Sequence, residues 1–197
     1  MNANTITIGE CRLSYVHLFK PYSNMPGQEA KYSVVALLPK TNTKAKAQID
    51  AAIEAAKQMG LQNRWNGQAP AVVATTVHDG DSVKANGEAY GPECAGHWVI
   101  NCNANVDHPP KVVDSRLQPI MNESEVYSGI YGYINLNFYA YLFSGKKGIG
   151  CGVLAVMKTR DGQPLGGSAP SVDEAFAGIT VPQPSAGSVD PITGLPV

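Results

Sequence analysis

Residues 127–143, YSGIYGYINLNFYAYLF, decide the fold and hold five of the nine tyrosines and two of the four phenylalanines. Read with a period of two, the stretch separates into two faces. From residue 130 onward the even positions are apolar or glycine: Ile130, Gly132, Ile134, Leu136, Phe138, Ala140 and Leu142. Apart from Gly129, the odd positions are aromatic or amide: Tyr127, Tyr131, Tyr133, Asn135, Asn137, Tyr139, Tyr141 and Phe143. This alternation predicts a strand with one buried aliphatic face.

The second face of this strand carries no charge, unlike an ordinary solvated face. Tyrosine rings interleaved with amides suit contact with flat polar ligands such as bases or sugars. Tyrosine is also favoured in any strand, and a sheet covered on both sides would show two such faces. The pattern alone leaves both interpretations open.

The length of the chain fits one domain with a tail, and its many glycines and prolines suit a β fold with many turns. The chain has 197 residues, 20 glycines and 14 prolines. Charged residues make up 16% of it, below the ~25% usual for soluble domains. All 15 lysines and arginines lie at or before Arg160, and only acids follow. A basic body with an acidic end is typical of proteins that meet polyanions, although a solvated tail without lysine would look the same.

The order of elements predicts a mainly β fold. Alternation or β-branched runs predict strands over residues 5–19, 32–38, 72–77, 97–103, 127–143 and 148–158. A period near 3.6 predicts one α-helix over about residues 43–59, capped by Thr43 and ended by Gly60. We therefore predict a five-stranded oligonucleotide/oligosaccharide-binding (OB) barrel with one inserted helix. This domain would span residues 1–167, followed by a flexible Pro/Gly/Ser-rich tail over residues 168–197.

The N-terminal residues show neither the basic nor the apolar region of a signal peptide. No stretch approaches the ~18 apolar residues of a membrane span. The four cysteines are therefore expected to stay reduced. We expect a cytoplasmic protein without a membrane partner.

The sequence gives weak support to catalysis. Cys94, His97, Cys102 and His108 are close enough in sequence to hold zinc, but a second tight ligand pair is missing. Asp79, Asp81, Glu88 and Glu93 lie in a glycine-rich loop that turn chemistry explains. No nucleophile motif or triad is present. We therefore expect no enzymatic activity, metal or cofactor. An Arg64-Trp65 pair could stack on a base, but a loop tryptophan more often covers a core.

Of the candidate functions, binding to single-stranded nucleic acid accounts for the most residues in one consistent arrangement. Such binding combines stacking aromatic groups with basic residues along the phosphates. The tyrosine-rich strand leads into Lys146 and Lys147, and the returning strand ends at Lys158 and Arg160. The predicted contacts are Tyr131, Tyr133, Tyr139, Tyr141, Lys146, Lys147, Arg12, Lys158, Arg160 and Trp98.

Several segments together resemble the single-stranded-DNA-binding proteins of tailed bacteriophages. They are RLSYVHLFKP (12–21), KYSVVALLPK (31–40), YSGIYGYINLNFYAY (127–141), GKKGIGCGVLAVMK (145–158) and RDGQPLGG (160–167). The resemblance implies an OB barrel with an inserted helix that coats single strands during viral replication or recombination in the host cell. It also implies DNA contact by the four tyrosines from Tyr131 to Tyr141 and by Lys146 and Lys147.

The tail departs from this family. Many relatives end in a densely acidic segment that recruits replication enzymes, whereas residues 168–197 hold three acids here. Recruitment of viral replication or recombination enzymes through the tail is therefore a weaker expectation.

Two other functions remain. In a structural or assembly β-protein of a virus, the Tyr/Asn face would be a subunit interface. In a Mg²⁺- or Zn²⁺-dependent nuclease, the acidic or cysteine-rich segments would hold the metal.

Overall fold

The computed structural model describes residues 2–23 and 25–166. Its strands are β1 (Thr5–Tyr22), β2 (Lys31–Pro39), β3 (Val77–Asp79), β4 (His97–Ala104), β5 (Lys111–Val113), β6 (Tyr131–Phe143) and β7 (Lys146–Arg160). One α-helix, α1 (Thr43–Asn63), and two short 3₁₀ helices, η1 (Pro92–Cys94) and η2 (Glu123–Glu125), complete the elements of this part. The tail predicted over residues 168–197 lies outside the described residues, so the domain boundary stays a prediction.

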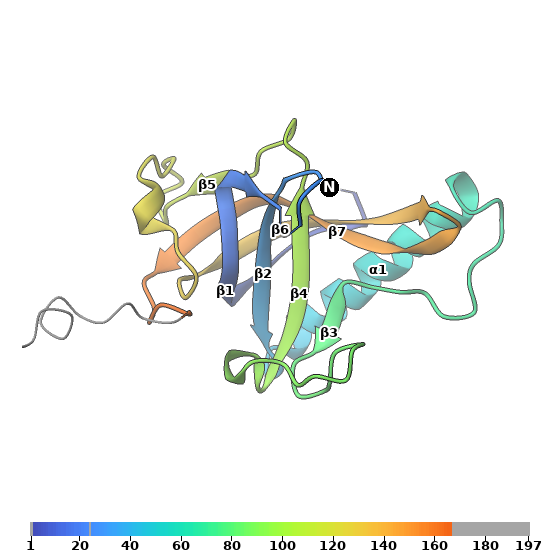
Figure 1. Ribbon diagram of the computed structural model, residues 1–197, viewed down its shortest axis with the longest axis horizontal. Coiled ribbons are helices and arrows are strands. Elements are labelled where there is room, and N and C mark those ends of the chain that lie inside the picture. Colours follow the sequence, from blue (N-terminus) through green and yellow to red (C-terminus); the bar gives the residue numbers. More distant parts are fainter. Residues whose placement is uncertain (1, 24, 167–197) are drawn as a thin grey trace, which may run out of the picture. The chain divides into compact units, whose positions relative to one another are not determined.

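Five strands close into a barrel. The sheet runs β3-β4-β2-β1-β6-β7-β5, and a parallel pairing of β4 with β7 at Asn103 and Gly152 joins its two sides. The barrel therefore consists of five strands, which follow one another around it in the order β1, β2, β4, β7, β6 (Figure 1). Short β3 and β5 add to its edges. The predicted OB-type barrel with a single inserted helix is confirmed.

The core fills the barrel with the aliphatic face predicted for residues 130–140. Ile130, Ile134, Leu136 and Phe138 of this region are fully buried. A second, smaller cluster lies on the outside of the barrel, where Leu37, Cys94 and Val99 pack under the loop before β4.

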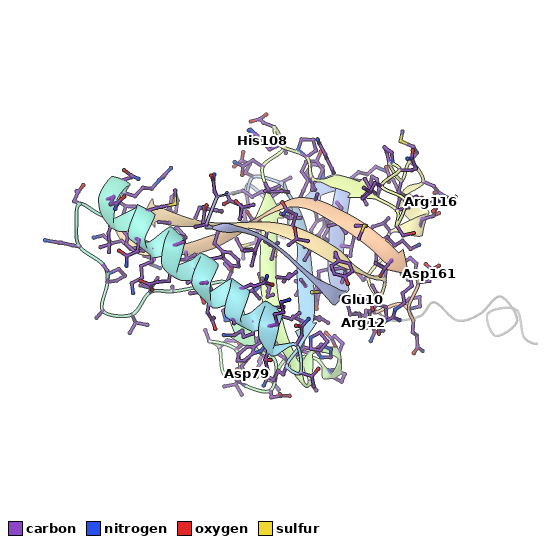
Figure 2. The ribbon with its side chains drawn as sticks, turned by 180° about the vertical axis from the view of Figure 1, so that it is seen from behind. Glu10, Arg12, Asp79, His108, Arg116 and Asp161 are labelled. Atoms are coloured by element: carbon purple, nitrogen blue, oxygen red, sulfur yellow. The ribbon has the colours of Figure 1, made fainter. Side chains whose placement is uncertain are left out.

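The helix begins at Thr43, but its N-cap is Asn42, whose side chain accepts a hydrogen bond from the Ala45 amide at 3.1 Å. The helix runs to Asn63, so the predicted end at residue 59 is wrong. Gly60 lies inside the last turn and not after it. Because glycine has no side chain, α1 can pack closely on β6 at this point. Figure 2 shows α1 running along the β6–β7 hairpin.

The other differences from the predicted elements are small. The strand predicted over residues 72–77 is instead β3, at Val77–Asp79. The first strand continues through Pro21 to Tyr22. No helix in the described part of the chain is long and apolar enough to cross a membrane.

Candidate nucleic-acid interface

The outer face of β6 carries the tyrosines, as the alternation predicts. We call Tyr131, Tyr133, Asn135, Asn137, Tyr139 and Tyr141 the tyrosine face. Tyr133 and Tyr139 are each 40% exposed, whereas the intervening Leu136 and Phe138 are fully buried. Burial raises the pKa of Tyr139 above its ordinary value of 10.0, so its phenol remains neutral near pH 7.

Each tyrosine of this face lies over a glycine of neighbouring backbone. The pairs are Tyr131 over Gly162, Tyr133 over Gly9, Tyr139 over Gly150 and Tyr141 over Gly148. A Cβ atom added at any of these glycines would lie only 2.4–2.7 Å from the nearest tyrosine side-chain atom. The absence of side chains at these glycines therefore allows the tyrosine rings to pack directly against the backbone.

The two asparagines of the face are used inside the protein. Asn135 Nδ2 donates to Thr7 Oγ1 at 2.8 Å, and Asn137 Oδ1 accepts from Asn4 Nδ2 at 2.9 Å. These bonds fix the outer surface of β6 to the start of β1.

The two lysines at the hairpin point to opposite sides. Ser144 and Gly145 form the turn with positive φ, and Lys146 then pairs with Phe143 on the side of the tyrosine face. Lys147 pairs with Leu142, on the other side. Its Nζ donates to the carbonyl oxygens of Trp65 and Gln68, at 3.3 and 2.8 Å. Successive strand residues alternate sides, so only Lys146 shares the tyrosine side, which differs from the prediction.

The cations at the other end of the ribbon are engaged by protein groups. Arg160 stacks 3.5 Å from the centroid of the Tyr131 ring and bonds Glu10, with Nη2 and Oε2 2.8 Å apart. Hydrogen bonds from Arg160 and Thr159 hold the pKa of Glu10 below its ordinary value of 4.5. Arg12 Nη2 donates to the Gln163 carbonyl at 2.7 Å. Figure 2 shows Glu10 and Arg12 near the end of β7.

Lys158 is also engaged. Its Nζ lies 2.8 Å from Asp161 Oδ1 and donates to the Glu125 carbonyl at the same distance. The predicted cations near Tyr131 are thus present, but they are paired with acids or carbonyl groups.

The two tryptophans belong to the folded body. Trp65 is 1% exposed, and its Nε1 donates to the Tyr141 carbonyl at 2.9 Å. It therefore covers the core, the more frequent role for a loop tryptophan. Trp98 packs against the core with the Lys46 ammonium 4.6 Å from its ring centroid. It does not share a surface with the tyrosine face.

The candidate metal ligands do not converge. Cys94 packs in the outer cluster, whereas Cys102 faces the barrel core with its Sγ 3.5 Å from Cys151 Sγ. Lys40 bonds both Asp79 and Asp81. Within residues 2–23 and 25–166, no group of three or more His, Cys, Asp or Glu side chains could hold a metal ion.

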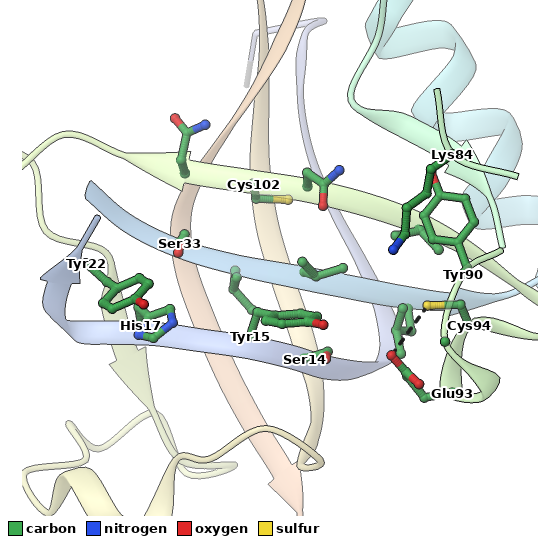
Figure 3. Close-up of a pocket in the computed structure, with 17 residues that line it drawn as sticks. Ser14, Tyr15, His17, Tyr22, Ser33, Lys84, Tyr90, Glu93, Cys94 and Cys102 are labelled. Atoms are coloured by element: carbon green, nitrogen blue, oxygen red, sulfur yellow. Dashed lines mark hydrogen bonds between the residues drawn. The ribbon is translucent and has the colours of Figure 1, made fainter. Parts of the chain in front are cut away.

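The sequence did not reveal a groove on the outside of β1, β2 and β4. This strand groove has a volume of about 480 Å³. Ser33, Val35 and Asn101 line it on β2 and β4, and aromatic side chains stand around it (Figure 3). In an OB fold, the face of the second and third barrel strands binds oligonucleotides. Those strands are β2 and β4 here.

The aromatic groups of the strand groove come from β1 and from the loop before β4. Tyr15 is 66% exposed, and Tyr22 stacks on His17 with ring centroids 4.4 Å apart. Figure 3 shows Tyr15 between this stacked pair and Tyr90 at the other end. Lys84 Nζ lies 5.8 Å from the Tyr90 ring centroid, and Glu93 is nearby.

A bulge explains why Tyr15 was not predicted to line this surface. Simple alternation puts Tyr15 on the side of buried Leu13. The pairing of β1 with β2 shifts between Ser14 and His17, and Tyr15 adopts φ 47°. A bulge of this kind turns side chains to the other face. Tyr90 lies in an irregular loop, where sequence periodicity gives no signal.

Two smaller depressions adjoin the tyrosine face. A seam groove of about 440 Å³ crosses the β4–β7 pairing and is lined by Asn103, Asn105, Asn137, Tyr139 and Gly152, among others. A helix cleft of about 250 Å³ lies between the end of α1 and β6 and includes Arg64 and Tyr139. Tyr139, one of the four predicted tyrosines, therefore lines both the seam groove and the helix cleft.

Solved structures of phage proteins share this fold. The single-stranded DNA-binding protein from bacteriophage Enc34, solved in complex with ssDNA, matches with a TM-score of 0.70 and 28% identity. The match covers 83% of this chain and 90% of that one. The single-stranded DNA-binding protein encoded by bacteriophage T7 matches with a TM-score of 0.57, covering 83% of this chain and 95% of that one. At 12% identity, this second match supports the fold alone.

Sequence comparison gives the same grouping. A putative protein, p50, of Acyrthosiphon pisum secondary endosymbiont phage 1 is 28% identical over 181 residues, 86% of this chain and 91% of that protein. The family model described as the ssDNA-binding protein of Enterobacter phage Enc34 matches residues 4–183. The resemblance to phage single-stranded-DNA-binding proteins is confirmed, and the chain belongs to the Enterobacter phage Enc34 ssDNA-binding protein family.

Proposed function

We propose that this protein binds single-stranded DNA without catalysis and with little preference for sequence. We further propose that it acts in viral DNA replication or recombination in the host cytoplasm. The strand groove carries this proposal, because it places exposed aromatic rings on the face that OB folds use for oligonucleotides. Membership in the Enc34 family supports the same ligand.

Base stacking supplies the affinity in this proposal. Tyr15 and Tyr22 are 66% and 51% exposed in the free protein. Every base has a π-face, so stacking tolerates any sequence and contributes about 1–3 kcal/mol per base. Tyr22 is already held by His17, so less side-chain entropy is lost when a base stacks on the pair.

The tyrosine face is the second part of the proposed surface. Because Tyr139 and Tyr141 lie over Gly150 and Gly148, one side of each ring contacts backbone. The partial exposure of Tyr139 leaves room for a base at its outer side. Lys146 stands at the hairpin end of this face as a phosphate contact. Tyr131, Tyr133, Arg12, Lys147, Lys158, Arg160 and Trp98 remain predicted contacts.

Viral replication or recombination enzymes are proposed partners of residues 168–197. This part of the proposal rests on the sequence, since the segment lies outside the described residues.

Titration of oligo(dT) by fluorescence anisotropy tests DNA binding, at two salt concentrations and against a duplex of equal length. We expect tighter binding to the single strand and an affinity that falls with salt. Tyr15→Ala should weaken binding by about 1–3 kcal/mol, the contribution of one stacked base. Met121→Ala is a matched control, because Met121 is 86% exposed and does not line the strand groove.

Equal affinity for single and double strands would refute the single-strand preference. A large defined oligomer in light scattering, without DNA affinity, would instead favour a viral assembly protein with the tyrosine face as an interface.

A further inference from the structure

We infer that a bound single strand does not end in the strand groove but continues across the β4–β7 seam to Tyr139. This inference rests on the proposed function and specifies its ligand path. The path would make the two separate surfaces described above one extended site.

The depressions share residues at each junction. Asn103 lines both the strand groove and the seam groove. Tyr139 lines both the seam groove and the helix cleft. The three depressions therefore follow one another around the outside of the barrel.

The junction at the seam carries no charged side chain and no crowded one. Asn103 faces Gly152 across the parallel pairing of β4 with β7. A Cβ atom added at Gly152 would meet no heavy atom closer than 3.5 Å, unlike the glycines under the tyrosines. A side-chain atom at Gly152 therefore fits without a clash, and Gly152 lies in the floor of the seam groove.

Asparagines follow the path along β4 and beyond it. Asn101 lines the strand groove, Asn103 lies at the junction and Asn105 lines the seam groove. Among the described residues, the side chains of these three make no hydrogen bond within the protein, in contrast to Asn135 and Asn137. Each amide offers donors and an acceptor, so together they can bond any base edge without selecting one.

The far end of the path provides a stacking group and a cation. Tyr139 is 40% exposed at the end of the seam groove. Arg64 lines the adjoining helix cleft. A base on the Tyr139 ring and a phosphate near Arg64 would complete the contacts of a longer strand.

The size of the barrel fits such a path. Going from β1 over β2, β4 and β7 to β6 takes four steps between neighbouring strands, which is about 19 Å at the usual spacing. Single OB folds bind about 4–16 nucleotides. The strand groove covers the first two of these four steps, so the full path is about twice as long and takes correspondingly more nucleotides.

The length dependence of affinity tests the inference. Fluorescein-labelled oligo(dT) of about 5 and about 14 nucleotides, near the two ends of that range, is titrated against the full chain. We expect the longer oligonucleotide to bind at least tenfold more tightly per site. Tyr139→Ala should remove about tenfold or more of this gain, the loss of one stacked base. Gly152→Glu should remove more of it than Gly152→Gln, because only Glu puts a negative charge at the junction.

The outcomes separate the path from the proposed function. Met121→Ala serves as the control and should keep the full gain with length. Binding of the short oligonucleotide without any gain for the longer one would overturn the path and leave the strand groove in place. Equal weakening of both lengths by Tyr139→Ala would also overturn it. Failure of wild-type protein to bind either oligonucleotide would refute the proposed function itself. Circular dichroism melting of each variant shows whether the fold is retained.

Discussion

The close packing of α1 on the β6–β7 hairpin gives a prediction with a definite sign. A Cβ atom at Gly60 would lie 2.5 Å from the Ala140 Cβ and 3.2 Å from two atoms of the Trp65 ring. Carbon atoms in favourable contact are about 3.5–4.0 Å apart. Ala140 Cβ is attached to the β6 backbone, and Trp65 is held by its hydrogen bond to the Tyr141 carbonyl. Relief therefore requires α1 and the hairpin to move apart by about 1 Å.

Two effects of Gly60→Ala oppose each other. Replacing glycine by alanine inside a helix stabilises the folded state by about 1 kcal/mol. Overpacking a filled core costs about 1–3 kcal/mol. We expect the upper part of that cost because both neighbours are anchored to the backbone. The variant should therefore be less stable than the wild type by about 1–2 kcal/mol.

Urea unfolding followed by tryptophan fluorescence measures this change. The double variant Gly60→Ala/Ala140→Gly removes the clashing methyl group from the strand side. It should be more stable than the sum of the two single changes predicts, by about 1–2 kcal/mol. A more stable Gly60→Ala protein, or additive single changes, would refute the close contact as the reason that glycine occupies this position.

Three further predictions concern charge and support around the tyrosine face. Because Arg160 and Thr159 lower the pKa of Glu10, its carboxylate adds stability above the ordinary pKa of 4.5, and this is lost as pH falls through the lower folded value. Thermal melting of Glu10→Gln should therefore depend less on pH between about pH 5 and 3; the same dependence as wild type would contradict the assigned bond. Lys146→Gln should reduce the slope of log affinity for oligo(dT) against log salt by about 0.7, one phosphate contact, and an unchanged slope would remove Lys146 from the site. Trp65→Phe leaves the Tyr141 carbonyl without its donor and should cost about 1–3 kcal/mol in urea unfolding, whereas an unchanged stability would show that this bond is dispensable.

The barrel could be predicted because the sequence of one strand, β6, shows which of its residues face the core and which face outward. From Gly132 to Ala140 every second residue of β6 is buried, so Ile134 and Leu136 alternate with tyrosine and asparagine without interruption. The helix was also visible from its period, but not its end. Gly60 looked like a terminator because the sequence does not show that Ala140 occupies the space where its side chain would be.

The strand groove could not be predicted because it depends on irregular backbone. The bulge at Tyr15 reverses the side that simple alternation assigns to it. Tyr90 reaches the groove from a loop whose path is set by the outer cluster of Leu37, Cys94 and Val99. These long-range contacts have no local signature. Similarly, Lys146 and Lys147 are adjacent in sequence, and only the strand register shows that they point to opposite sides.

The structure also brings together the two interpretations that the tyrosine-rich strand left open. A tyrosine over a glycine packs against the sheet with one side of its ring, which satisfies the structural interpretation. Tyr139 is 40% exposed, so part of its side chain remains accessible after this packing. Because Gly150 holds this ring in place before any ligand arrives, little side-chain entropy remains to be lost when a base stacks on it. In the binding mode that we propose, packing on the glycine and stacking on a base would therefore use different parts of the same side chain, and the packing would orient the ring for the base.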